Sequence, residues 1–480
     1  MKYKNLCVGV VFLTGMMSKQ GLAAPLFQTI NPTGLTANQA IIAADLSRGH
    51  FFIPAFVTSQ VVTPQIIRPQ IPFPVSDIAQ IFQKIANTPD VGTRASDLSQ
   101  LSPQPLQVMR NIAFDNMGFA VNDLDNHLAS LRYGAGGLDT SGLSVMDSSM
   151  PSFLSQIKGR LLAWDPAMND SGLISDTVEP VLGGVTMSDA KDMKSIAPAA
   201  EANRWSTYIS GGVVIADVGS DADVAHSHFT TGNVTAGADY RLNDNWAVGA
   251  LFGYGNTAAK TDNAGSEIDV DSYSPGIYAT YADQGWFANG LFSFDYNQYN
   301  ENRVISFLSR TANGAPDGTQ YNGNLDGGYE FHSGALTFGP VAALQYVHLD
   351  VDGFTETNAG AADLQVDEQQ VDSLRSRLGG AVRYNWQWYG GKVIAVPHLS
   401  ASWQHEYLQN ENGITSQFAG QGLGSFTVTT SSVERDSVLV DTGIDVQWNH
   451  AFSTFIDYQA QAGQSDFFAQ AIQAGLKINF

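Results

Sequence analysis

The chain has 480 residues, too many for one ordinary domain, so at least two parts are expected. Charged residues make up only 15% of it and glycine is abundant at 47 residues, a mix typical of many strands joined by tight turns. The formal net charge of −22 argues against a nucleic-acid-binding protein, because phosphate binding requires Lys and Arg. No uninterrupted apolar run reaches roughly 18 residues, so no helical membrane span is indicated.

The first 23 residues have the features of a secretory signal peptide. Lys2 and Lys4 give a positive start, an apolar run follows over 6–17, and cleavage is expected after Ala23. An uncleaved membrane anchor is the alternative interpretation. The only cysteine, Cys7, lies in this segment, so the mature chain is expected to have no disulfide, thiolate metal site or cysteine nucleophile.

Residues 24–187 are expected to form a small, mostly helical or irregular region. Thr36 and Ser76 are candidate starts of short helices. Between these helices, several prolines predict an extended connector at about 54–75, because proline cannot lie inside a helix.

A longer helix is predicted after Ser102-Pro103, a capping residue followed by a proline that suits the first helical position. Apolar residues then recur at spacings of three and four from Leu106 to Leu131. We expect this stripe to pack on the neighbouring short helices, with a partner-binding helix as the alternative. Residues 188–204 are expected to be a connector or a pore segment, with Lys191 and Lys194 available to carboxylates.

From Trp205 the sequence alternates with period two. Twelve candidate strands follow: 205–217, 229–243, 246–259, 267–283, 285–299, 318–333, 335–350, 369–388, 391–408, 435–449, 451–464 and 466–480. Each is long enough to cross a bilayer at a tilt. We therefore predict a mainly β fold with a 12-stranded antiparallel transmembrane β-barrel over 205–480.

The connections between these strands alternate in length. Those after the even-numbered strands are short, whereas the odd-numbered ones include long loops at about 300–317, 351–368 and 409–434. Outer-membrane barrels have this parity, with tight periplasmic turns and long outer loops. Pro275 and Pro340 do not fit, because proline cannot donate a ladder hydrogen bond, so a bulge or locally weak pairing is expected there.

Aromatic residues at both ends of apolar stripes predict two interfacial girdles. Trp246 and Tyr254 bound one such face, and Trp286 and Tyr296 bound another. Phe252 is expected to face lipid near mid-bilayer.

Several charged residues are predicted to face the lumen: Asp239, Glu330, Arg375, Arg377, Arg383, Asp441 and Asp445. They can form a salt-bridge network that keeps the pore filled. The alternative is a ring of charges that selects solutes.

Four segments of the predicted barrel resemble the bacterial autotransporter family: Gly-Phe-Thr-Glu at 353–356, Ser-Arg-Leu-Gly at 376–379, Trp-Gln-His-Glu-Tyr at 403–407 and Gly-Leu-Lys-Ile-Asn-Phe at 475–480. The resemblance covers the C-terminal β-barrel translocator domain of that family. It implies a Gram-negative outer-membrane protein of type V secretion, which exports or displays a passenger at the cell surface. The passenger, here 24–187, departs from the long Gly-rich repeats that many members carry.

The resemblance also implies a helix just before the first strand that occupies the pore. It implies an assembly signal at Leu476, Ile478 and Phe480, and partners in outer-membrane lipids, periplasmic chaperones and the barrel-assembly machinery. The passenger's ligand is not indicated.

No catalysis and no cofactor are expected. The Gly-Asp-Ser-Leu motif of an esterase branch of the family is absent, and Ser144 lacks the second glycine of a nucleophile elbow. Asp221, Asp223, His226 and His228 are read as a solvated loop rather than metal ligands, because their spacing is not metal-specific. The alternative functions are a porin-like diffusion channel with an N-terminal plug, and an esterase passenger.

Overall fold

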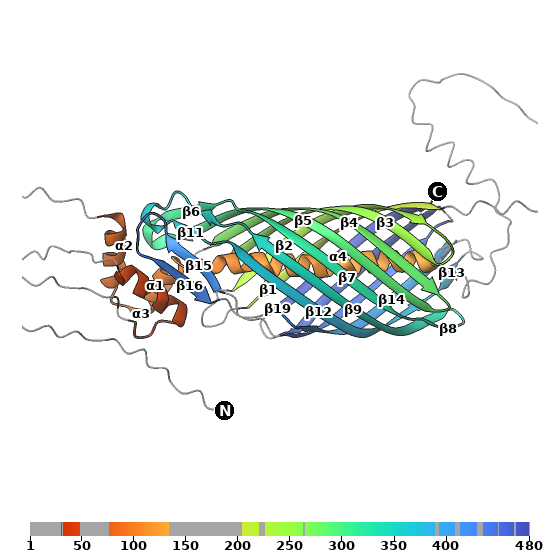
Figure 1. Cartoon of the computed structure of the whole chain (residues 1–480). Helices are drawn as coiled ribbons and strands as arrows, with labels where there is room; N and C mark the ends of the chain where they lie inside the picture. The colour runs from red at the N-terminus through yellow and green to blue at the C-terminus, as the bar shows by residue number, and fades with distance from the viewer. Residues whose placement is uncertain are drawn as a thin grey trace, which may run out of the picture.

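The computed structural model describes residues 30, 32–48, 76–133, 204–219, 226–262, 265–388, 393–408, 413–429, 435–449, 451–464 and 467–479. Helices come first along the chain and strands follow (Figure 1). The helices are α1 (Ala37–Arg48), α2 (Asp77–Ala86), α3 (Val91–Ser99) and α4 (Gln107–Tyr133), with the 3-10 turn η1 (Gln104–Leu106) before α4. None of these described helices is both long and apolar enough to span a bilayer.

Local capping explains where the first helices begin. Gln39 N donates to Thr36 Oγ1 at 3.4 Å and Thr36 N donates to Gln39 Oε1 at 3.0 Å, a reciprocal capping box that starts α1 as predicted. The sequence analysis does not predict α3, which begins where Asp90 accepts a hydrogen bond from Thr93 N. Ser102 accepts from Gln104 N at 3.2 Å, so it starts the short turn η1 rather than α4 itself.

The predicted 12-stranded antiparallel barrel is confirmed, and its wall closes where the first strand pairs with the last. In chain order the wall strands are β1 (Trp205–Val218), β2 (Ser227–Arg241), β3 (Trp246–Thr261), β4 (Ser266–Asp283), β5 (Trp286–Ile305), β7 (Asp317–Tyr329) with β8 (Phe331–Ser333), β9 (Leu336–Val351), β12 (Gln369–Tyr384) with β13 (Trp386–Trp388), β14 (Val393–Glu406), β17 (Asp436–Gln447), β18 (Phe452–Gln464) and β19 (Phe467–Asn479). Two of the twelve wall strands are interrupted, so each consists of two segments: β7 with β8, and β12 with β13.

The two prolines interrupt pairing without shifting the register. Pairing of β4 with β5 stops at Tyr273 and resumes at Gly276, in the same register on both sides of Pro275. Pairing of β9 with β7 and β8 likewise skips Pro340. Locally weak pairing is therefore the outcome at both sites, because each proline lacks the N–H that a ladder bond needs.

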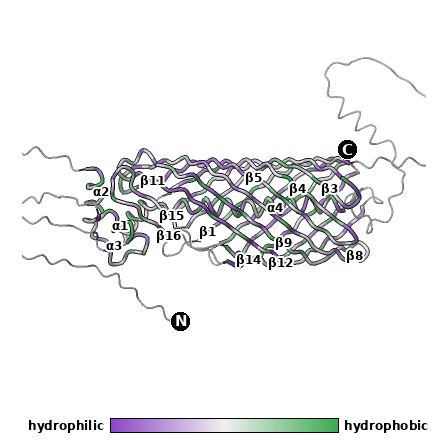
Figure 2. Tube along the Cα trace, in the orientation of Figure 1, coloured by the Kyte–Doolittle hydropathy of each residue, from purple (hydrophilic) through white to green (hydrophobic). Residues whose placement is uncertain are grey.

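The outer face of the wall is apolar between two levels of aromatic rings. Phe252, Ile277 and Leu325 point outward and are each more than half exposed. Neighbouring rings pair at both levels: Trp205–Tyr240, Trp246–Tyr281 and Trp286–Tyr329 near the short turns, and Tyr254–Tyr273 and Phe294–Tyr321 at the other level. Figure 2 shows apolar and polar residues alternating along the strands. This pattern matches an apolar band between two aromatic girdles.

The long-loop end carries structure that the sequence analysis missed. Four short strands form a second sheet there, in the order β10 (Phe354–Thr355), β11 (Leu364–Val366), β15 (Gly413–Phe418) and β16 (Ser425–Thr429). Strand β6 (Arg310–Gly314) extends β5, and the 3-10 turns η2 (Ser306–Leu308) and η3 (Gly360–Ala362) lie beside it. Helix α1 contacts β16 and α2 contacts η3, so α1–α3 sit on this end (Figure 1).

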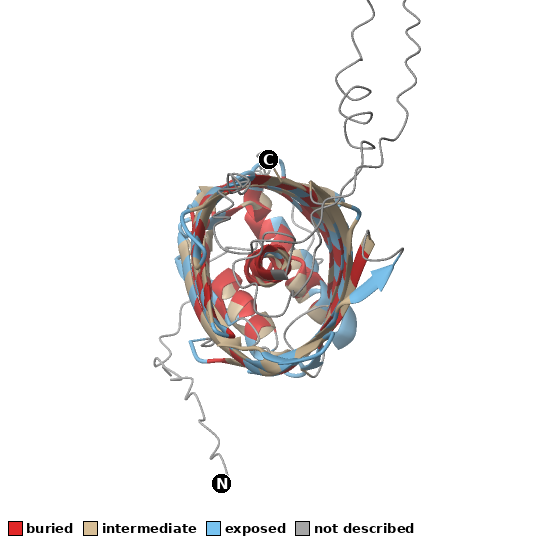
Figure 3. Ribbon diagram, turned by 90° about the vertical axis from the view of Figure 1, so that its right-hand side faces the viewer, coloured by how far each residue is buried: buried red, intermediate tan, exposed pale blue. Residues whose placement is uncertain are grey.

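Helix α4 runs along the inside of the barrel, where Figure 3 shows it end-on within the ring of strands. The expectation that its apolar stripe packs on the short helices is wrong, because α4 contacts β1, β2, β4, β5, β7 and β9. An apolar stripe needs a partner surface, and the inward apolar residues of the wall supply one. The segment predicted to fill the pore, 188–203, lies outside the described residues.

Candidate functional site

The candidate site is the lumen together with the helix that fills it. The start of α4 lies near the long-loop ends of the strands, where Gln107 and Val108 line a small pocket with Val218 and Arg303. Its last turn lies near the short turns, where the Arg132 guanidinium is 4.1 Å from the centre of the Phe287 ring and Arg132 Nε is 3.4 Å from Glu330 Oε1. By the loop parity of outer-membrane barrels, α4 starts at the outer end and finishes at the periplasmic end.

One cluster of polar contacts fixes α4 to the first strands. His127 Nε2 lies 2.9 Å from Asp239 Oδ2, and the imidazole stacks on the Tyr208 ring with centroids 3.8 Å apart. Ser206 Oγ donates to Asp239 Oδ2 at 2.6 Å, and Tyr278 OH donates to Asp239 Oδ1. Asp239 thus accepts hydrogen bonds from the wall and pairs with the helix, so its buried carboxylate is satisfied.

Two arginines of β12 hold the opposite side of α4. Arg375 Nε donates to Glu406 Oε2 at 3.0 Å, and its Nη1 lies 3.7 Å from Asp115 Oδ1 of the helix. Arg377 Nη2 lies 3.5 Å from Oδ2 of Asp125, which is closer to the C-terminal end of α4. Carboxylates of the helix therefore meet guanidinium groups of the wall, as the filled-pore interpretation of these arginines requires.

Further polar contacts join α4 to other strands. Ser210 Oγ donates to Asp123 Oδ2 at 2.7 Å, and Asn122 Nδ2 donates to Asp441 Oδ2 at 2.8 Å. Lys477 Nζ donates to Ser130 Oγ at 3.4 Å. These partners come from β17, β19 and β1, which lie on one arc of the wall between Asp239 of β2 and the arginines of β12.

Apolar side chains of the helix also pack on the wall. Met117, Leu124 and Leu128 belong to the same buried cluster as Val214 and Leu291 of the wall. A cavity of about 110 Å³ remains between helix and wall on the side of β2–β5. The helix that fills the lumen therefore packs on the wall through apolar contacts as well as polar ones.

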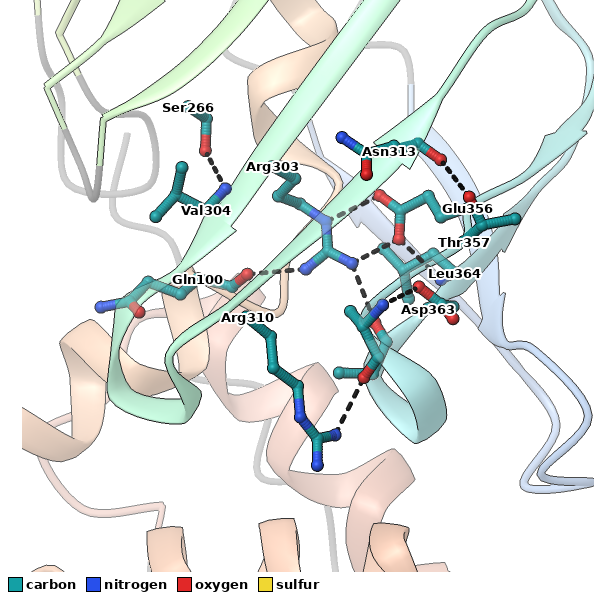
Figure 4. A network of polar contacts seen from close by, with 12 residues as sticks. Gln100, Ser266, Arg303, Val304, Arg310, Asn313, Glu356, Thr357, Asp363 and Leu364 are labelled. Carbon is teal, nitrogen blue, oxygen red and sulfur yellow. Dashed lines mark hydrogen bonds and ion pairs between the residues drawn. The ribbon is translucent and has the colours of Figure 1, made fainter.

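At the outer end, Arg303 of β5 gathers three segments around one guanidinium (Figure 4). Its Nε donates to Glu356 Oε1 at 2.8 Å, its Nη1 to the carbonyl of Gln100 at 2.7 Å, and its Nη2 to the carbonyl of Ala362 at 2.9 Å. Arg303 and Glu356 are each 1% exposed in their side chains. This buried and fully bonded pair ties the end of α3 to the outer sheet, and such a pair needs these extra bonds to offset desolvation.

A second arginine fastens α2 to the same end. Arg310 Nη1 and Nη2 donate to the two oxygens of Asp77 at 2.7 and 2.8 Å, and Ala361 N donates to Asp77 Oδ2 at 2.9 Å. The hydrogen bonds from Arg310 hold the pKa of Asp77 below its usual value. The ion pair is partly exposed, but its bidentate geometry makes it stronger than a pair with a single hydrogen bond.

The remaining residues selected from the sequence lie on the wall. Trp246, Tyr254 and Trp286 are exposed on its outer face, and Tyr296 is half-buried there. Asp445 Oδ2 lies 3.4 Å from His398 Nδ1, and Arg383 lines a lumen pocket with Arg132. Leu476 pairs with Ile209 of β1 and Ile478 with Thr207, whereas Phe480 lies outside the described residues.

Of the outer-loop candidates, His226 and His228 lie near Asp262. Asp221, Asp223 and Ser144 are outside the described residues. The sequence analysis missed the polar groups of α4 that bind the wall, among them Asp115, Asn122, Asp125 and His127. A signal was present: these residues lie in a helix that is too polar on one side to pack only on short helices.

Comparisons with known proteins point to one family. The model of the family described as "Autotransporter beta-domain" matches residues 209–459, just over half of the chain. Esterase EstA of Pseudomonas aeruginosa is 21% identical over 285 residues, which is 58% of this chain and 43% of that protein. An extracellular serine protease of Serratia marcescens is 24% identical over 269 residues, 55% of this chain and 25% of that protein. The chain thus spans less than half the length of these relatives.

Among solved structures, the translocator domain of autotransporter NalP from Neisseria meningitidis aligns with 58% of this chain and 90% of its own. The identity is 15% and the TM-score 0.48.

Proposed function

Because the chain belongs to the autotransporter β-domain family, whose barrels lie in the outer membrane, we propose that this barrel exports its own N-terminal region and displays helices α1–α3 at the cell surface. The passenger is then the short helical region before the barrel. Insertion of the barrel depends, in this proposal, on periplasmic chaperones and the barrel-assembly machinery.

The observation that carries the proposal is the direction of α4. The helix starts at the long-loop end and finishes at the short-turn end, where β1 also starts. A chain that has been moved outward through the lumen is left in this arrangement, with its leading part outside and its trailing part inside. A plug inserted from the periplasm has no need to place α1–α3 beyond the outer sheet.

Single cysteines test the direction of the chain. In a Cys7→Ser background, Ala44→Cys places a thiol at an exposed position of α1, and Asp244→Cys places one in an exposed short turn. A membrane-impermeant maleimide should label residue 44 in intact cells. It should label residue 244 only after the outer membrane is permeabilised. Protection of residue 44 until permeabilisation would overturn the proposal.

Absence of catalysis is also part of the proposal, and the lack of a Gly-Asp-Ser-Leu motif supports it. Its test is hydrolysis of a short acyl ester by the purified chain, compared with a Ser144→Ala variant. Activity lost in that variant would favour the esterase alternative.

A further inference from the structure

Three neighbouring wall strands bring a histidine and an aspartate together over a glycine. His398 of β14, Gly443 of β17 and Asp457 of β18 are paired in register across the sheet. A Cβ atom at Gly443 would overlap with the Asp457 carboxylate, so the missing side chain lets the two outer residues meet above the middle strand. Asp441 lies two residues before Gly443 and therefore on the same inward face.

The distances within this group suit one bound cation. His398 Nε2 lies 2.8 Å from Asp457 Oδ1 and 3.5 Å from Asp441 Oδ1. The three candidate ligand atoms all lie within 4.8 Å of one another. Ligand atoms about 2.1 Å from a tetrahedral zinc ion are about 3.4 Å apart, so shifts of about 1.5 Å or less bring the three atoms to this spacing.

The group is buried and its polar atoms are poorly satisfied. His398 is 6% exposed, Asp441 3% and Asp457 2%. Neither oxygen of Asp457 and neither ring nitrogen of His398 makes a hydrogen bond with acceptable angles, although His398 Nε2 and Asp457 Oδ1 are close enough for an ion pair. Buried polar groups in native proteins almost always have partners, and an ion between these three would satisfy them together.

The surroundings resemble the outer contacts of a metal site. His398 Nδ1 lies 3.4 Å from Asp445 Oδ2, and a ligating histidine commonly turns its second nitrogen toward a carboxylate that orients the ring. Asn122 of α4 donates to Asp441 Oδ2 at 2.8 Å, leaving Oδ1 for the ion. A cavity of about 90 Å³ borders Asp441 and has room for a water molecule beside this ligand.

We propose that His398, Asp441 and Asp457 form a binding site for one divalent transition-metal ion inside the barrel, with Zn²⁺ the best match to one imidazole and two carboxylates. Two carboxylates balance the charge of the ion. Through the bond from Asn122 to Asp441, the ion also helps to fasten α4 to β17.

Metal retention by the folded full chain tests the site. The chain, without a polyhistidine tag, is folded in detergent, incubated with Zn²⁺ and dialysed, and zinc is measured by mass spectrometry. We expect one zinc per chain, with at least tenfold weaker retention in His398→Gln and in Asp457→Asn. Retention that is absent, or unchanged in both folded variants, would overturn the proposal.

Two controls separate this site from others. His226→Gln with His228→Gln removes the histidines of the outer-loop cluster and should leave the retained zinc unchanged. Gly443→Ala keeps every ligand but fills the space between them, so it should also lose zinc. If the lumen variants do not fold, Co²⁺ bound to the unaltered chain decides: intense visible absorption of a tetrahedral site is expected, and its absence would refute the proposal.

Discussion

Single residues determine which side of the wall faces lipid. Phe252 of β3 is 52% exposed, between the outward Trp246 and Tyr254 that mark the two aromatic levels. On the same face, Asn256 lies beyond Tyr254, where Asn256 Nδ2 donates to Asp271 Oδ1 at 3.0 Å. The same strand thus offers an apolar and a polar position that face outward at different depths.

Phe252→Arg should destabilise the folded barrel by about 2–4 kcal/mol, because it places a charge near the bilayer midplane. Asn256→Arg is the matched control and should cost about 0–1 kcal/mol, since it lies near the interface. Urea unfolding in liposomes measures both. Equal stability of the two variants would contradict the assignment of the lipid face.

The pH dependence of the outer end should follow Asp77. Its pKa is lowered in the folded state by the bonds from Arg310, so the stabilisation is present above the unfolded value of about 3.9 and is lost as the pH falls through the folded value. The pair is partly exposed, so its loss should reduce amide protection factors in α2 by about fivefold at most.

Asp77→Asn should reproduce this loss at pH 7 and show no further loss in the acidic range. Hydrogen exchange of α2, corrected for the intrinsic rate at each pH, is the measurement. Equal protection of the variant and the unaltered chain at pH 7 would show that the apolar contacts of α2 alone hold it in place.

Several residues at the site could not be assigned from the sequence, for a physical reason. Arg375 and Arg377 were selected because alternation places them on the inward face of one strand. Their partners Asp115 and Asp125 lie more than 200 positions away in the sequence. They belong to a helix whose polar residues could equally have faced solvent. Alternation identifies the face of a residue but not what it meets there.

At the scale of elements, α4 decides whether the lumen conducts ions. Among the described residues it makes polar contacts with strands on both sides of the wall, such as β2 and β12, and a cavity beside it has a volume of only about 110 Å³. A closed lumen is therefore expected for the intact chain.

Deletion of 107–133 should convert the closed lumen into an open pore with steady conductance in planar bilayers. Deletion of the Pro-rich connector at 54–75 is the control and should leave the conductance low. If the intact chain conducts as strongly as the α4 deletion, the diffusion-channel interpretation replaces the translocator.

The local sequence pattern predicted the strands of the wall but not those of the outer sheet. The twelve wall strands lie within a few residues of their predicted bounds, apart from the longer outer end of β5, because period-two alternation is a local property. The outer sheet could not be predicted in the same way. Strands β10 and β11 have only two and three residues, too few to show a periodic pattern, and β11 pairs with β15 of another loop.

For the molecule as a whole, the loop parity predicted the orientation, and closure followed from the pairing of the first and last strands. The occupant of the lumen was expected in the segment just before β1, which lies outside the described residues; within the described part of the chain, α4 lies in the lumen. Both segments precede the barrel in the sequence. Sequence order alone does not show which segment fills the lumen, because this depends on whether the segment's shape and polar groups fit the inner face of the wall.

Helices α1–α3 at the outer end are joined to α4 inside the lumen and can therefore prevent the chain from sliding back into the periplasm. The lumen has room for one helix, so the packed group α1–α3 cannot pass back through it while folded. Folding outside would therefore turn random sliding of the chain into net outward movement. No energy source at the outer membrane is needed for such rectified diffusion, and the Arg303 and Arg310 contacts become part of what prevents the return step.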